Sequence, residues 1–66
     1  MSQVFKMSNT KTGRTITINE KIRNDGKAEY QGYLIDFNGK ELWGWGSELF
    51  PIVKKAIDEL EKGGAW

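Results

Sequence analysis

The side chains of this chain that are suited to chemistry are aromatic and basic. The aromatic candidates lie between positions 30 and 45 and are Tyr30, Trp43 and Trp45. Flat aromatic rings stack on nucleobases or anchor protein interfaces, while lysines and arginines meet phosphates. The basic and polar candidates come earlier in the chain and are Arg14, Thr17, Lys21 and Arg23. These residue types favour a binding surface over a reaction centre.

The chain has no histidine and no cysteine, which limits its catalytic chemistry. The usual nucleophile and base pairs, and the usual zinc ligands, are therefore missing. No spacing among the carboxylates, lysines and hydroxyls indicates a preorganised site. We expect a protein that is not an enzyme and that carries no metal and no cofactor.

The small size of the chain predicts self-association. A domain of 66 residues buries only about 60% of its unfolded surface, and no disulfide or metal is there to support it. We therefore expect a homodimer. The absence of cysteine, of a signal-peptide layout in residues 1–7 and of a long apolar segment predicts a cytoplasmic protein with no membrane partner.

Four stretches of the sequence are predicted strands, and these strands must position the aromatic and basic candidate side chains. Arg14 to Arg23 alternates, with Ile16, Ile18 and Ile22 on one face, which is typical of a half-buried strand. Turn residues follow at 24–26 and at 38–39. The sequence predicts strands at about 3–9, 14–23, 28–37 and 40–45 and a helix at about 48–62, all within a single domain spanning 1–66. The expected fold is α+β: an antiparallel β-meander of three to four strands, followed by one C-terminal amphipathic helix packed on one sheet face.

The pair Asn38-Gly39 predicts a two-residue hairpin turn. That turn sets Asp36 opposite Glu41 and gives the hairpin two apolar faces. One face is expected to carry Tyr33, Ile35, Phe37 and Leu42. The other is expected to carry Tyr30, Leu34, Trp43 and Trp45.

The predicted helix has recognisable ends. Ser47 is placed to cap its N-terminus, and Gly63 suits a left-handed C-terminal cap. The three residues after Gly63, ending in Trp66, are expected to form a loose or back-folded tail.

Three interpretations of the face with Tyr30, Trp43 and Trp45 remain open. The face is the core beneath the helix, or a protein-binding patch, or a stacking platform for single-stranded nucleic acid. The platform gains support if the isoleucines of the second strand point to the helix, because Thr17, Lys21 and Arg23 then share the aromatic face. Residues 1–27 carry six basic and two acidic residues, a net charge of +4, whereas residues 28–66 carry four lysines and seven acids, a net charge of −3.

The hairpin Tyr30 to Trp45 followed by the helix Ser47 to Lys62 resembles, in topology, the single-stranded-DNA-binding domains of transcriptional coactivators. The resemblance covers about half of the chain and assigns no residue. We expect a small non-catalytic binding module whose leading partner is single-stranded nucleic acid. The alternative is a protein target on the same aromatic face, as for a small inhibitor or adaptor encoded by a virus or mobile element.

Overall fold

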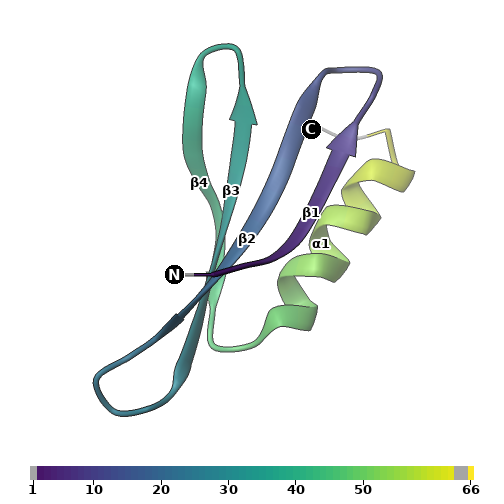
Figure 1. Cartoon of the computed structure of the whole chain (residues 1–66). Helices are drawn as coiled ribbons and strands as arrows, with labels where there is room; N and C mark the ends of the chain where they lie inside the picture. Colours follow the sequence, from purple (N-terminus) through teal and green to yellow (C-terminus); the bar gives the residue numbers. More distant parts are fainter. Residues whose placement is uncertain (1, 64–65) are drawn as a thin grey trace.

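The computed structural model describes residues 2–63 and Trp66, which form one antiparallel sheet and one helix (Figure 1). Strands β1 (Ser2–Asn9), β2 (Arg14–Ile22), β3 (Ala28–Asp36) and β4 (Gly39–Gly46) lie in the sheet in sequence order, and helix α1 (Leu49–Glu61) follows them. The predicted α+β meander is confirmed, and each element boundary lies within one residue of its prediction. No helix in the described ranges is long and apolar enough to cross a membrane.

The core lies between one face of the sheet and α1. Ile16 and Ile18 of β2 are fully buried, as the alternating pattern of that strand predicts. Ile52 and Ala56 of α1 cover them, and the fifth buried apolar side chain is that of Trp66. The helix therefore packs on the isoleucine side of the sheet.

The predicted register of the hairpin between β3 and β4 is wrong. Asp36 pairs with Gly39 and Leu34 pairs with Glu41, so the two carboxylates of Asp36 and Glu41 do not face each other. The turn is made by residues 37 and 38 because the Asp36 Oδ1 atom accepts the N–H of Asn38 at 2.8 Å. Gly39 then starts β4 with φ 123°, a value that favours glycine.

A β-bulge in β4 moves Trp45 to the face opposite the predicted one. Tyr33 pairs with Leu42 and Gly32 pairs with Gly44, so Trp43 is an extra residue between them. An extra residue reverses the facing of every side chain beyond it. Trp45 consequently pairs with Gln31, on the side of the sheet away from the helix.

The two ends of α1 differ from each other in how well the sequence predicts them. Gly63 adopts φ 66° and donates its N–H to the carbonyl of Leu60 at 3.1 Å, which confirms the predicted C-terminal cap. The predicted N-terminal cap is wrong, because Glu48 occupies that position without a side-chain cap hydrogen bond. A cap at Ser47 would place Pro51 at the first helical position that must donate an N–H, which proline lacks.

Candidate nucleic-acid interface

The side of the sheet that faces away from α1 is exposed, and we call it the open face. Residues directly opposite each other in neighbouring strands share a face, so the pairing with the buried isoleucines assigns the others. The open face is formed by Gln3, Lys6, Ser8, Thr15, Thr17, Asn19, Lys21, Glu29, Gln31, Tyr33, Ile35, Lys40, Leu42 and Trp45.

Two aromatic side chains, Tyr33 and Trp45, lie on the open face in the β3–β4 half of the sheet. The Trp45 side chain is 64% exposed, and its Nε1–H donates to Glu29 Oε1 at 2.6 Å. The Tyr33 hydroxyl donates to Gln31 Oε1 at 2.9 Å, and Lys40 Nζ lies 4.3 Å from the centre of the tyrosine ring. Each ring therefore has a polar partner beside it on the open face.

The β1–β2 half of the open face is polar. Thr17 pairs with Lys6 on one side and with Tyr33 on the other, so hydroxyl, ammonium and aromatic groups follow one another across the sheet. The Ser8 and Thr15 hydroxyls are hydrogen-bonded at 3.0 Å. Hydroxyl and amide groups of this kind can bond to base edges or to sugar and phosphate oxygens.

The charge of the open face is positive. Its three ammonium groups belong to Lys6, Lys21 and Lys40, and its one carboxylate belongs to Glu29, which pairs with Lys21 across the strands. Lysines arranged around aromatic rings suit a polyanion that also carries flat bases.

Tyr30 and Trp43 lie on the other side of the sheet, against the helix. Both pack on the core, and Lys55 of α1 places its Nζ 4.4 Å from the centre of the Trp43 ring. The Tyr30 hydroxyl donates to Glu20 Oε2 at 2.9 Å. This hydrogen bond, together with burial and the negative charge of Glu20, raises the pKa of Tyr30 above its ordinary value of 10.0.

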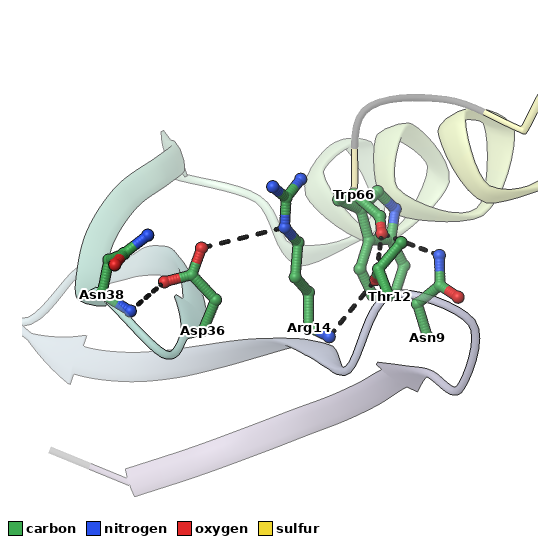
Figure 2. A network of polar contacts seen from close by, with 6 residues as sticks. All are labelled: Asn9, Thr12, Arg14, Asp36, Asn38 and Trp66. Atoms are coloured by element: carbon green, nitrogen blue, oxygen red, sulfur yellow. Dashed lines mark hydrogen bonds and ion pairs between the residues drawn. The ribbon is translucent and has the colours of Figure 1, made fainter.

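Arg14 and Arg23 lie outside the open face. Figure 2 shows Arg14 beside Asp36, with 3.8 Å between Arg14 Nε and Asp36 Oδ2, near Trp66 on the helix side. Arg23 lies in the turn between β2 and β3 and pairs with Asp25 at 3.5 Å. Of the seven candidates from the sequence, the structure therefore brings three together on the open face, namely Thr17, Lys21 and Trp45.

Lys6, Gln31, Tyr33 and Lys40 are among the residues of the open face that sequence reasoning did not identify as binding candidates. For Tyr33 the cause is the bulge at Trp43, because it moves Trp45 away from the face of Trp43 and onto the face of Tyr33. The alternation of glycine and tryptophan in residues 43–46 was the available signal, since a glycine inside a strand often marks a bulge.

We compared the chain with models of protein families, with curated proteins and with solved structures. None of the three comparisons finds a match.

Proposed function

We propose that this protein is a non-catalytic module that binds single-stranded nucleic acid on its open face. The observation that supports this is that Trp45 and Tyr33 share one exposed sheet surface with Lys21 and with Lys40, whose ammonium group lies over the tyrosine ring. The bases of an unpaired strand would stack on the two rings, and the lysines would meet its phosphates. Tyr30 and Trp43 take no part in this proposal, because both pack beneath the helix.

The first test is the binding of a fluorescent single-stranded DNA of about 20 nucleotides, followed by anisotropy at about 20 mM and about 150 mM salt. We expect Trp45→Ala to weaken binding about 5- to 150-fold, because stacking contributes about 1 to 3 kcal/mol per base. Trp45→Phe keeps an aromatic ring and should retain most of the affinity. Wild-type affinity in the alanine variant would contradict the proposal.

A lysine variant separates phosphate contacts from stacking. Lys21→Gln should reduce the slope of log affinity against log salt by about 1, which is the effect of losing one phosphate contact. The matched control is Lys62→Gln, because Lys62 lies at the end of α1 and not on the open face. The proposal fails if both variants change the salt slope equally.

A protein partner on the same face is the second candidate. Leu42 is 59% exposed and pairs with Tyr33, which gives the face an apolar centre, and tyrosine and tryptophan are the side chains enriched at interface hot spots. Binding to a protein through this centre would depend little on salt, whereas phosphate binding weakens steeply as salt rises. With either partner, we propose that the protein is cytoplasmic and forms a homodimer.

A further inference from the structure

The turn between β3 and β4 carries an asparagine directly before a glycine, and both residues are exposed to water. Outside the strand pairing, the contact of Asn38 with the described residues is the hydrogen bond from its main-chain N–H to Asp36 Oδ1 at 2.8 Å (Figure 2). Its side-chain amide therefore has no hydrogen bond to any described residue. A Cβ added at Gly39 would have no atom within 4 Å, so open space lies beside the glycine.

Asn38 differs from the other three asparagines of the chain, because it alone is followed by glycine. The amide of Asn9 is held by hydrogen bonds through both its nitrogen and its oxygen. Asn19 lies inside β2, with a paired strand on each side. Asn24 is exposed in the turn between β2 and β3, but the residue after it is Asp25. Asn24 is thus similar to Asn38 in its exposure and differs in its neighbour.

We propose that Asn38 is a site of spontaneous deamidation in the folded protein. The main-chain nitrogen of Gly39 attacks the Asn38 Cγ, a carbon–nitrogen bond forms, and the side-chain nitrogen leaves as ammonia with the proton that Gly39 loses. Water then opens the cyclic succinimide. Cleavage at the Cγ carbonyl gives aspartate, and cleavage at the main-chain carbonyl gives isoaspartate. Either product adds one carboxylate, so the formal net charge falls from +1 to zero.

The position of Gly39 favours closure of the ring. A glycine has no side chain to hinder the attack, and its backbone reaches conformations that other residues avoid. Gly39 already adopts φ 123°. It forms the last pair of the β3–β4 ladder, with Asp36, and such terminal pairs open at a far lower cost than the whole fold does. The attacking nitrogen is therefore released without unfolding of the sheet.

Isoaspartate at position 38 would change the turn itself. The main chain of isoaspartate runs through Cβ and Cγ, so it is one methylene longer than the main chain of aspartate. The length of a hairpin turn sets the register of its two strands. We therefore expect the isoaspartate form to be less stable than the Asn38→Asp variant, which carries the same charge on an ordinary main chain.

The test is incubation of the folded protein at neutral and at mildly alkaline pH, followed by trypsin digestion and mass spectrometry. Trypsin releases peptide 28–40, in which Asn38 is the one asparagine, and peptide 24–27, which contains Asn24. We expect peptide 28–40 to gain the mass difference between a hydroxyl and an amino group and to separate into two species of equal mass. Its conversion should rise in proportion to hydroxide concentration, while peptide 24–27 keeps its mass.

Two controls separate the effect of the fold from that of the sequence. The free peptide 28–40 reports the intrinsic reactivity of the pair, and a digest at zero time reports conversion during the digestion. Asn38→Gln should keep the mass of its peptide, because the longer side chain closes a larger ring more slowly.

Three outcomes would overturn the proposal. In the first, the free peptide converts while the folded protein does not, which would show that the hairpin protects Asn38. In the second, the free peptide does not convert either. In the third, Asn24 and Asn38 convert at equal rates, which would remove the role of Gly39. For the effect on the turn, the isoaspartate form is purified by ion exchange and reversed-phase chromatography, and a urea midpoint equal to that of Asn38→Asp would contradict the expected loss of stability.

Discussion

At the scale of single residues, Tyr30 and Glu20 form a cross-strand pair on the helix side of the sheet. They lie directly opposite each other in β3 and β2, and the tyrosine hydroxyl donates to the carboxylate at 2.9 Å. The hydrogen bond, burial and the charge of Glu20 raise the pKa of Tyr30. The folded protein therefore holds this proton more tightly than the unfolded chain does.

The pair predicts a loss of stability at alkaline pH. The contribution of Tyr30 is fully present below the unfolded pKa of about 10 and is lost as pH rises through the higher folded value. We expect the urea midpoint to fall as the pH rises above about 10, and we expect Tyr30→Phe to show a smaller fall. The matched control is Tyr33→Phe on the open face, which leaves the Tyr30 pair intact. Equal alkaline losses in the wild type and Tyr30→Phe would contradict this prediction.

At the scale of elements, α1 approaches the sheet where β3 and β4 carry facing glycines. Gly32 and Gly44 are paired across the strands, and Ile52 of the helix lies over both. A Cβ added at Gly44 would lie 3.0 Å from Ile52 Cγ2, and one added at Gly32 would lie 3.1 Å from it. Ile52 is nearly buried in the core and has little room to shift, so the two glycines set how closely the helix packs.

Gly44→Ala should destabilise the protein by about 1 to 3 kcal/mol, as overpacking in a core does. This loss of stability outweighs the stabilisation of about 0.4 to 1 kcal/mol that alanine brings by lowering the conformational entropy of the unfolded chain. Urea unfolding measures the difference.

A double-mutant cycle with Ile52→Ala identifies the cause. Gly44→Ala should cost less in the Ile52→Ala background, because the clashing methyl group is absent. Equal costs in the two backgrounds would show that contact with Ile52 is not the reason for glycine at position 44.

Both edge strands of the sheet are irregular. The pairing of β1 with β2 shifts between Gln3 and Phe5, and that of β4 with β3 shifts at Trp43. Bulges on edge strands hinder the addition of a further strand. The exposed surfaces of this sheet are therefore better suited to side-chain contacts on its faces than to pairing along its edges.

At the scale of the whole molecule, Trp66 joins segments that are distant in the sequence. The side chain is 1% exposed, and its Nε1–H donates to the carbonyl of Ala56 in α1 at 3.0 Å. Its main-chain oxygen accepts hydrogen bonds from Asn9 at 2.7 Å and Thr12 at 2.8 Å, at the turn between β1 and β2 (Figure 2). Of the two predicted arrangements, loose or back-folded, Trp66 therefore adopts the back-folded one and is part of the core, while residues 64 and 65 of the predicted tail lie outside the described residues.

Trp66→Ala should destabilise the protein by about 3 to 5 kcal/mol, because it leaves a large cavity in the core. The core of a domain below about 70 to 80 residues rarely supplies more than about 3 to 5 kcal/mol, so much of the variant protein should unfold. Circular dichroism during urea unfolding measures this without relying on tryptophan emission. The control Trp45→Ala removes the same side chain from an exposed site and should retain the fold. Similar losses in the two variants would contradict the assignment of Trp66 to the core.

The sequence by itself determined the kind, order and approximate bounds of the elements. This was possible because those signals are local: the alternating isoleucines of β2, the turn glycines Gly13 and Gly26 with φ of 75° and 84°, and the helical spacing of Ile52 and Ala56.

Only the tertiary structure decided which side chains meet on each face of the sheet. One extra residue at Trp43 reverses the facing of Trp45. The hydrogen bond from the Asn38 N–H to Asp36 Oδ1 places the turn at residues 37 and 38 and so changes the predicted strand register. The place of Trp66 depends on Ala56, Asn9 and Thr12, up to 57 positions away in the chain. A local pattern carries no information on such contacts, because their free energy arises only when the sheet, the helix and the chain beyond it pack together.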